Sequence, residues 1–466
     1  MRSLLYFASA VAAMSVARQV NQDAVSVVNL ANNTGESKHG ASGVLYGLPL
    51  EIDQIPDKWF IDMDYGFSRG GGSAQTAGGH AWITSFEEYK IRMNAVVANY
   101  RIVRKYDGRY TAMLSDLWGA DGGQHQTDGP YPGDNGNWTM WDEFLAQVVK
   151  DLHENDAVEG MTLDIWNEPN GEVYWDRPQE QYHEAWARAY AYLRQELPNT
   201  WLSGPAVNVD PSVDSEWWTK YASFVSQNGT VPDEWAWHVL ANPDFATSRD
   251  RLWELLDKYS LPHNPININE YALDVEQTPV YSAWYIANFE RINAMGARSC
   301  WIPAFQAYDM LSGLLTKPNA GNPELYDPKD QNYQATGQYL VYQYYGSGMT
   351  GHRVETQISG NKDFDVYATV DGNNLKMLYG SRRQTGESAI LVNGLDAIGL
   401  PATGNLKIKV LAFPFPGGLE TGRFNAVDKP EDIGTFDVSY NDNFVQFPVW
   451  PADQFTAYAF EISGSS

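Results

Sequence analysis

The sequence predicts an α/β protein: a (β/α)8 TIM barrel with an accessory antiparallel β-sandwich. From about residue 44 to about residue 345, short apolar runs alternate with amphipathic segments, which is typical of parallel strands joined by crossover helices. After Tyr345 the helical periodicity ends and alternating hairpin patterns begin. Glu168 and Glu270 each close a short apolar run, and a barrel gathers such strand ends on one rim.

The length of the chain suits two domains. At 466 residues, of which 43% are hydrophobic, the chain is long enough for a barrel, a second domain and a large core in each. We expect a signal peptide at 1–17, N-terminal strands that join the β-sandwich at 18–43, the catalytic barrel at 44–345 and the C-terminal β-sandwich at 346–466.

Strand candidates follow one another along the barrel region. The early run Ala24–Leu30 alternates as a strand of the sandwich would, and Val44–Gly47 opens the barrel. The later candidates are Met113–Ser115, Met161–Ile165, Leu202–Pro205, Trp235–Val239, Ile266–Ile268 and Cys300–Ile302.

Helical patterns lie between these runs. The clearest spans Gln179–Leu197, with its aromatic and apolar residues on one face, and stops at Pro198. A doubly wound open sheet would show the same alternation. The barrel is favoured because the candidate active residues lie on several separated strand ends and no Gly-rich phosphate-binding turn follows the first strand.

Hairpin patterns dominate the C-terminal region. The run Phe364–Val370 passes through the turn Asp371–Asn374 and returns as Leu375–Tyr379. Two further runs, Leu406–Leu411 and Phe455–Phe460, alternate in the same way. These patterns predict an antiparallel β-sandwich.

Glu168 and Glu270 are the strongest candidates for chemistry. Cleaving a glycosidic bond with retention needs one protonated and one ionised carboxyl group about 5–5.5 Å apart. At that distance two anions repel, which raises one pKa and divides the roles. Asn167 is placed to donate its amide to a sugar 2-hydroxyl. A lone strand-end glutamate more often caps a helix or pairs with an arginine, but Trp166–Pro169 together with a second glutamate favours catalysis.

The two motifs resemble those of the clan A retaining glycoside hydrolases. Trp166–Asn170, followed about a hundred residues later by Asn269–Tyr271, is most similar to glycoside hydrolase family 39, which includes β-xylosidases and α-L-iduronidases. The resemblance covers roughly residues 40–345 and implies a (β/α)8 barrel with a β-sandwich. It implies that Glu168 ends the fourth strand as acid/base and that Glu270 ends the seventh as nucleophile.

Other barrel positions also match the family. Gly204–Ala206 resembles its fifth strand and His238 its sixth, while Trp301 would lie on the eighth as a platform beneath the sugar. Family members commonly carry an aromatic residue two positions after the sixth-strand histidine. This chain has Leu240 there, so another group must orient Glu270.

Two polar residues are candidates for substrate binding. Arg69, within Gly66–Gly72, stands where the clan often places an arginine near the nucleophile. It would hold Glu270 ionised or form a plain structural ion pair. His238 either donates to a sugar hydroxyl or is a satisfied core histidine. We expect no metal, because no His or Cys pair has ligand spacing nearby.

Aromatic residues reach 14%, with 17 Trp and 28 Tyr. Most should pack the core, and the candidates for the glycone subsite are Trp118, Trp237 and above all Trp301. The loop Gly122–Thr127, after the third strand, is either a lid over the cleft or a simple surface loop.

The N-terminus has the pattern of an export signal. Arg2 forms a short basic region, Leu4–Met14 an apolar one and Ser15–Ala17 a cleavage site. No other stretch approaches 18 apolar residues, so we expect a soluble, secreted and extracellular protein. Glycosylation sequons at Asn32, Asn137 and Asn228 agree with that route.

Charge and cysteine content limit the partners. The net charge of −26 argues against binding to nucleic acid or anionic membranes, because both need a cationic surface. Cys300 is the single cysteine, so no internal disulfide can form, and its apolar setting suggests an inert small hydrophobe rather than a nucleophile. The expected partner is an oligosaccharide or polysaccharide, without a cofactor.

The leading hypothesis is a secreted retaining exo-glycosidase that acts on cell-wall or other polysaccharide-derived glycans. An endo-acting glycanase or a transglycosylase would use the same two carboxylates. A carbohydrate-binding protein without chemistry is the alternative from a different class, and the presence of both Glu168 and Glu270 argues against it.

Overall fold

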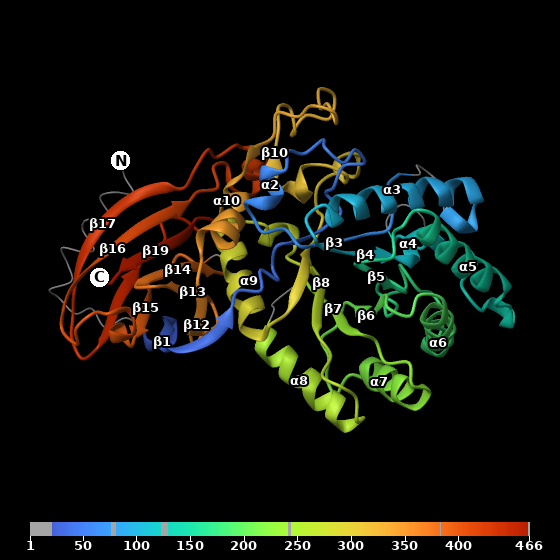
Figure 1. The fold of residues 1–466 in the computed structure, drawn as a ribbon, viewed down its shortest axis with the longest axis horizontal. Helices are drawn as coiled ribbons and strands as arrows, with labels where there is room; N and C mark the ends of the chain where they lie inside the picture. The colour runs from blue at the N-terminus through green and yellow to red at the C-terminus, as the bar shows by residue number, and fades with distance from the viewer. Residues whose placement is uncertain (1–20, 76–80, 123–128, 241–243, 383, 465–466) are drawn as a thin grey trace.

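The computed structural model describes residues 21–75, 81–122, 129–240, 244–382 and 384–464. Eight parallel strands close into a barrel, which confirms the predicted (β/α)8 fold (Figure 1). In order they are β2 (Gly43–Leu45), β3 (Phe67–Gly70), β4 (Arg109–Met113), β5 (Met161–Asp164), β6 (Trp201–Val207), β7 (Glu234–Val239), β8 (Ile266–Tyr271) and β9 (Met295–Arg298).

Helices cover the outside of the barrel (Figure 1). They are α2 (Lys58–Ile61), α3 (Phe86–Arg104), α4 (Leu114–Trp118), α5 (Thr139–Glu154), α6 (Gln179–Glu196), α7 (Glu216–Asn228), α8 (Phe245–Lys258), α9 (Pro279–Ile292) and α10 (Gly337–Gln343). The helix predicted before Pro198 is α6. Local signals fix other ends: Ser215 accepts a hydrogen bond from the backbone of Trp218 at the start of α7, and Gly229 closes α7 in the left-handed region.

Two predicted strands are wrong. β4 ends at Met113, and the residues that follow it form α4. β9 ends at Arg298, before Cys300–Ile302. Leu114 after β4 and Ile302 after β9 are buried at the rim of the barrel without strand pairing, whereas Trp301 is exposed. Cys300 is partly buried there, and burial raises the pKa of its thiol, which keeps it protonated.

The second domain is a nine-stranded, mostly antiparallel sheet. Its strand order is β17-β16-β19-β14-β13-β12-β1-β15-β18. The bounds are β1 (Val25–Glu36), β12 (His352–Gln357), β13 (Phe364–Asp371), β14 (Asn374–Ser381), β15 (Ser388–Asn393), β16 (Gly404–Phe413), β17 (Glu431–Tyr440), β18 (Phe444–Val449) and β19 (Ala457–Ser463).

The early strand β1 lies between β12 and β15, antiparallel to the first and parallel to the second. The edge strands β17 and β18 approach each other, so the sheet curls around its own apolar core. The structure also contains the short strand pair β10 (Leu315–Thr316) and β11 (Gln334–Ala335) and the short helix α11 (Gly418–Thr421).

Helix α9 joins the two domains. It packs against β13 and β14, and nearly all of its residues are buried because it lies between the barrel and the sheet (Figure 1). Gly380 allows close contact, since a Cβ there would lie 2.3 Å from the backbone nitrogen of Trp284. At the helix end, Arg291 donates to Asp365, which also accepts from Asn288 at 3.0 Å.

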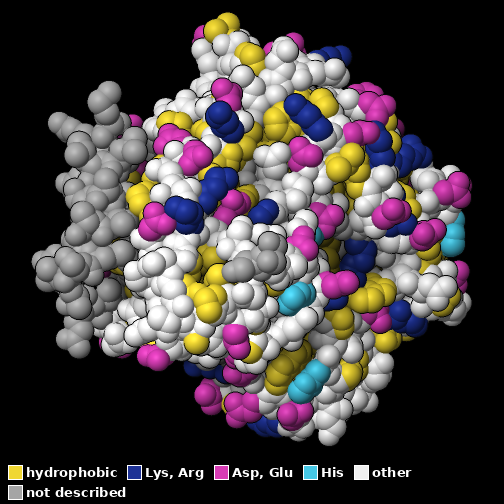
Figure 2. All heavy atoms as spheres, turned by 60° about the vertical axis from the view of Figure 1, so that its left-hand side comes forward, with side chains coloured by type: hydrophobic (Ala, Val, Ile, Leu, Met, Phe, Trp, Pro, Cys, Tyr) yellow, Lys and Arg dark blue, Asp and Glu magenta, His cyan; other side chains and the backbone are white. Residues whose placement is uncertain are grey.

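The surface is mixed in charge. Figure 2 shows acidic side chains spread over the displayed face and interspersed with lysines and arginines. Among the described residues, no helix is both long and apolar enough to cross a membrane. The predicted signal peptide at 1–17 lies outside the described residues.

Candidate active site

Glu168 follows β5 in a strained backbone conformation. Its φ is +42°, a left-handed value that side-chain-bearing residues rarely adopt. Its N–H donates to the carbonyl of Ala206 at 2.9 Å, and Ala206 is itself left-handed, with a φ of +55°. Such strain costs about 1–3 kcal/mol per residue and is typical of functional sites. The backbone is therefore held in an unfavourable state that aims this carboxylate.

Glu270 lies at the end of β8, on the same rim. In the β7–β8 pairing, His238 is opposite Glu270. A carboxylate oxygen of Glu168, one of Glu270 and a ring nitrogen of His238 all lie within 4.8 Å of one another. The carboxylate oxygens of Glu168 and Glu270 are therefore at most 4.8 Å apart, which is shorter than the roughly 6.5–9.5 Å gap of inverting enzymes and suits a retaining mechanism. The two glutamates, far apart in the chain, thus face one reaction centre.

Arg69 of β3 organises the floor of the site. Its Nη1 donates to Glu270 Oε1 at 2.7 Å, and its Nη2 and Nε donate to Asp164 Oδ2 at 2.6 and 3.0 Å. The guanidinium is fully buried. Burial alone would lower its pKa, but the charges of Asp164 and Glu270 outweigh this and raise it. Arg69 therefore stays charged and places a positive group against the carboxylate of Glu270.

The same guanidinium orients Asn167. Arg69 Nη2 donates to Asn167 Oδ1 at 2.6 Å, which fixes the side-chain carbonyl on the protein side. The amide N–H groups of Asn167 are then left to donate to a substrate hydroxyl, as its position in the sequence predicts. The backbone N–H of Asn167 donates to Ser115 Oγ of α4 at 3.2 Å.

His238 contacts the acid/base candidate directly. Its Nδ1 lies 2.7 Å from Glu168 Oε1 and 3.7 Å from Glu270 Oε2. Asn208, which the sequence pattern did not reveal, donates to Glu168 Oε2 at 3.0 Å. Burial would raise the pKa of Glu168, but the hydrogen bond and charge of His238 and the hydrogen bond of Asn208 lower it below its ordinary value.

This direction is opposite to the raised pKa expected from repulsion between two carboxylates. The reason is that His238 and Asn208 both hydrogen-bond the carboxylate of Glu168 and so supply partners for its ionised form. These contacts outweigh burial and favour the deprotonated carboxylate.

Trp301 lies on the rim just beyond β9 and is 41% exposed. Its indole N–H donates to the carbonyl of Ala272 at 2.9 Å, two residues past Glu270. Arg423, from the β16–β17 connection of the second domain, donates to the carbonyl of Trp301 at 3.0 Å and pairs with Asp274. The sheet domain thus supports an open aromatic face beside the nucleophile candidate.

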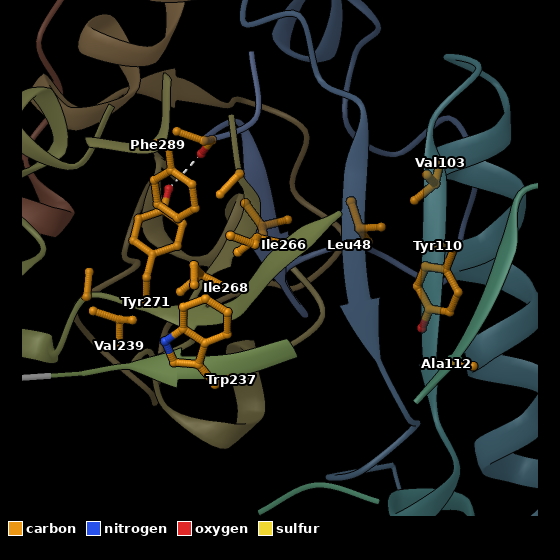
Figure 3. Packing of buried hydrophobic residues seen from close by; sticks show 14 of the residues in the cluster. Leu48, Val103, Tyr110, Ala112, Trp237, Val239, Ile266, Ile268, Tyr271 and Phe289 are labelled. Atoms are coloured by element: carbon orange, nitrogen blue, oxygen red, sulfur yellow. Dashed lines mark hydrogen bonds between the residues drawn. The ribbon is translucent and has the colours of Figure 1, made fainter. Parts of the chain in front are cut away.

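The structure places Trp118 and Trp237 in the core, so neither lines the cleft as expected. Trp118 is 1% exposed and packs edge-on against Trp141. Trp237 is fully buried, and Figure 3 shows it beside Ile268 among apolar side chains. Side chains alternate along β7, so the strand that points His238 inward turns its neighbour Trp237 outward toward the helices.

A second acidic group lies on the rim near Arg69. Asp116 of α4 is buried and accepts a hydrogen bond from the hydroxyl of Tyr46, which follows β2. Gly71 makes this approach possible, since a Cβ there would lie 2.3 Å from the Cβ of Asp116. Burial, and then the charge of Asp121, raise the pKa of Asp116 to about 7. The glycines after β3 therefore make room for a buried acid.

Glu168, His238 and Glu270 are close enough together to surround a metal ion. Their existing contacts compete with such an ion. The imidazole nitrogen already faces Glu168 at 2.7 Å, and the buried guanidinium of Arg69 already neutralises Glu270. A divalent cation would have to displace both contacts and stand beside a positive charge.

Two further expectations from the sequence concern the loop Gly122–Thr127 and Leu240. Most of the loop Gly122–Thr127 lies outside the described residues. Leu240 is described and half-buried, and it has no polar atom with which to orient Glu270. Among the described residues, Arg69 and His238 contact the carboxylate of Glu270.

No family model and no curated relative matches the chain. Solved structures do. The structure of N2152 from Neocallimastix frontalis is 20% identical, with a TM-score of 0.72 over 95% of this chain and 99% of that one. A GH39 β-xylosidase from Caulobacter crescentus is 14% identical, with a TM-score of 0.55 over 94% and 99%.

A GH30 endoxylanase from Clostridium papyrosolvens C71 is 13% identical, with a TM-score of 0.55 over 94% of this chain and all of that one. The similarity spans both domains in each case. The chain therefore has the barrel-and-sheet fold of solved glycoside hydrolases, a family 39 β-xylosidase among them.

Proposed function

We propose that the protein is a retaining glycoside hydrolase with Glu270 as nucleophile and Glu168 as acid/base. The observation that carries the proposal is the cluster of Glu168, His238 and Glu270, whose functional atoms lie within 4.8 Å of one another on the barrel rim. The fold shared with solved glycosidases supports it.

In the first step, Glu270 Oε attacks the anomeric carbon and forms a covalent glycosyl-enzyme bond. The bond from that carbon to the leaving oxygen breaks, and this oxygen takes the proton of the Glu168 carboxyl group. Arg69 donates a hydrogen bond to Glu270 and holds it in place for attack, and the amide of Asn167 donates to the sugar 2-hydroxyl as positive charge develops on the ring.

In the second step, Glu168 accepts a proton from water. The water oxygen attacks the anomeric carbon, the bond to Glu270 breaks, and the sugar leaves with its original configuration. The hydrogen bonds from His238 and Asn208 lower the pKa of Glu168, which suits it to act as base in this step.

Azide rescue separates the two roles. We expect Glu270→Gly to lose turnover on every nitrophenyl glycoside that the wild type cleaves, and added azide to restore part of it with an inverted glycosyl azide as product. Glu168→Ala with azide should give a glycosyl azide of retained configuration, because azide then attacks the covalent intermediate. Glu172→Gln, an exposed carboxylate in the same loop, is the matched control.

Labelling separates an enzyme from a binding protein. An activated 2-deoxy-2-fluoro glycoside should attach covalently to the wild type at Glu270, as peptide mass spectrometry would show. A protein that bound sugars without chemistry would stay unlabelled. If both glutamate variants keep most of the wild-type activity, the assignment is wrong.

We further propose exo action on cell-wall or other polysaccharide-derived glycans. The solved structures of the same fold include a β-xylosidase and an endoxylanase, so the fold is compatible with both actions. Product lengths from a defined oligosaccharide decide between them. Exo action releases one sugar at a time from one end, endo action gives mixed lengths from the start, and a transglycosylase gives products longer than the substrate.

Secretion is part of the proposal. The signal-like residues 1–17 support it, and the side chains of Asn32, Asn137 and Asn228 are exposed, as a glycosylated sequon must be. Expression with the native N-terminus in a eukaryotic secretion host, followed by deglycosylation and mass measurement, tests both points.

A further inference from the structure

The loop after Glu168 makes a tight turn that contains Asn170. The N–H of Gly171 donates to the carbonyl of Glu168 at 2.9 Å, which closes a β-turn with Pro169 and Asn170 in the middle. Proline is favoured at the second position of such a turn, because its ring fixes φ at the value that the turn needs. The turn therefore fixes the backbone of Asn170 relative to the acid/base candidate.

Asn208 belongs to the neighbouring loop, directly after β6. Its backbone N–H donates to Asn170 Oδ1 at 3.2 Å, and Asn170 Nδ2 donates to Asn208 Oδ1 at 2.6 Å. Nδ2 of Asn208 then donates to Glu168 Oε2 at 3.0 Å. The backbone bond from Glu168 to Ala206 joins the same two loops. The two asparagines thus form a reciprocal pair that contacts the carboxylate at one end.

A backbone group sets the direction of this chain of hydrogen bonds. A side-chain amide has a donor end and an acceptor end that exchange places by rotation, whereas a backbone N–H can only donate. The N–H of Asn208 requires the oxygen of Asn170, so the NH2 group of Asn170 faces the Asn208 side chain and requires its oxygen in turn. The NH2 group of Asn208 is then the end that faces Glu168.

This constraint matters because Asn208 is exposed, whereas Asn170 is half-buried. An exposed amide that rotated freely would turn its oxygen toward Glu168 in part of the molecules, and an oxygen beside a carboxyl group favours the protonated form. An amide donor favours the ionised form, and the hydrogen bond of Asn208 is among the causes that lower the pKa of Glu168. The orientation of one surface amide therefore affects the protonation of the acid/base candidate.

We propose that Asn170 is a positioning residue that holds the donor end of the Asn208 amide against Glu168. This inference rests on the proposed function and adds to it a residue that acts on the acid/base through a second side chain. Titratable or charged groups on three strands and in the loop after Glu168 also lie near this carboxylate: His238, Arg69, Glu270 and Tyr174. The variants that test the proposal leave all four unchanged.

The first test removes each asparagine in turn. Asn208→Ala takes away the donor, so the alkaline limb of kcat/KM on a nitrophenyl glycoside should move to higher pH by roughly half a unit to one unit. Asn170→Ala should move this limb in the same direction by no more than that, and should add nothing when residue 208 is already alanine. The acidic limb, which reports the nucleophile candidate, should stay in place.

The second test reverses the chain of hydrogen bonds. Asn170→Asp can still accept from the backbone N–H of Asn208 but cannot donate to its side chain, so the amide should rotate and present its oxygen to Glu168. The alkaline limb should then move further than in Asn170→Ala. The same substitution combined with Asn208→Ala should give a smaller shift, because only the effect of the added negative charge is left.

Asn155→Ala is the matched control. Asn155 donates to the carbonyl of Asp151 at 2.9 Å where α5 ends, at the opposite end of the barrel from the catalytic rim. Its loss should lower the melting temperature and leave both limbs of the pH profile in place. A merely structural role of Asn170 would have the same signature.

The proposal is overturned if Asn208→Ala or Asn170→Ala leaves the alkaline limb unchanged, or if their two shifts are additive. If a melting curve shows that Asn170→Ala does not fold, Asn170→Asp decides, and an equal shift with and without Asn208→Ala overturns the proposal. None of these outcomes touches the glycosidase assignment. That assignment fails separately, and the proposal with it, if the wild type cleaves no glycoside or if the Glu270 variants remain active.

Discussion

Nδ1 of His238 lies 2.7 Å from Oε1 of Glu168, 1.0 Å nearer than it lies to the second carboxylate. His238 therefore contacts the acid/base candidate more closely than the nucleophile candidate. Burial would raise the pKa of Glu168, but the hydrogen bond and charge of His238 lower it below its ordinary value. The protonation of the acid/base candidate thus depends on its histidine neighbour.

Replacing His238 with glutamine should move the alkaline limb of the kcat/KM profile to higher pH. The hydrogen bond and charge of His238 lower the pKa of Glu168, and glutamine supplies no charge, so the carboxyl group should keep its proton to higher pH. The pH dependence of kcat/KM on one nitrophenyl glycoside measures the shift. An unchanged alkaline limb would show that His238 does not set the pKa of Glu168.

Arg69 should be needed for both folding and activity. Arg69→Met leaves Asp164 and Glu270 buried without their cation, which typically costs about 3–5 kcal/mol. Arg69→Lys keeps a charge but loses the paired donors, so it should fold better than Arg69→Met and still turn over slowly. Melting temperature and kcat/KM measure the two effects. Arg188→Lys, in an exposed pair with Asp142, should change neither.

Trp301→Ala should raise KM more than it lowers kcat. If a sugar covers on the order of 50 Å² of the indole, the lost burial corresponds to roughly a tenfold change in KM. Trp118→Phe is a useful contrast, because Trp118 is buried in the core and its replacement should affect melting temperature and leave KM unchanged. Equal KM values for Trp301→Ala and the wild type would remove Trp301 from the binding site.

The sequence predicted the barrel and the facing glutamates because both depend on local patterns. An apolar run that ends in a polar residue marks a strand end, and a closed barrel brings all such ends to one rim. It did not reveal Asn208, because this residue lies in a loop without regular periodicity and reaches Glu168 only through the path of that loop.

The sequence also did not predict where some strands end or which of their side chains face the cleft. Cys300–Ile302 looks like a strand because its residues are apolar, yet β9 ends before it, and Ile302 is buried at the rim without pairing while Trp301 is exposed. Trp237 and His238 are adjacent and equally buried, and only the direction of alternation along β7 decides which one faces the cleft. A pattern of hydrophobicity does not distinguish the barrel interior from the interface between strands and helices, since both exclude water.

The buried carboxyl of Asp116 should make stability depend on pH. Its pKa is about 7 in the folded protein, against an ordinary value of 3.8. Between these values the folded state binds a proton that the unfolded state releases, so stability falls as the pH rises through this window. The effect is at most about 4 kcal/mol.

Asp116→Asn does not titrate and can still accept a hydrogen bond from Tyr46. Relative to the wild type, this variant should therefore be more stable at pH 7.5 than at pH 4.5. Melting temperatures of both proteins across this range measure the gap, and Asp142→Asn, which removes an exposed carboxylate, controls for net charge. A gap between wild type and Asp116→Asn that does not change with pH would mean that the acid is already ionised in the folded protein at low pH, with its buried charge satisfied by Tyr46 and the nearby arginines.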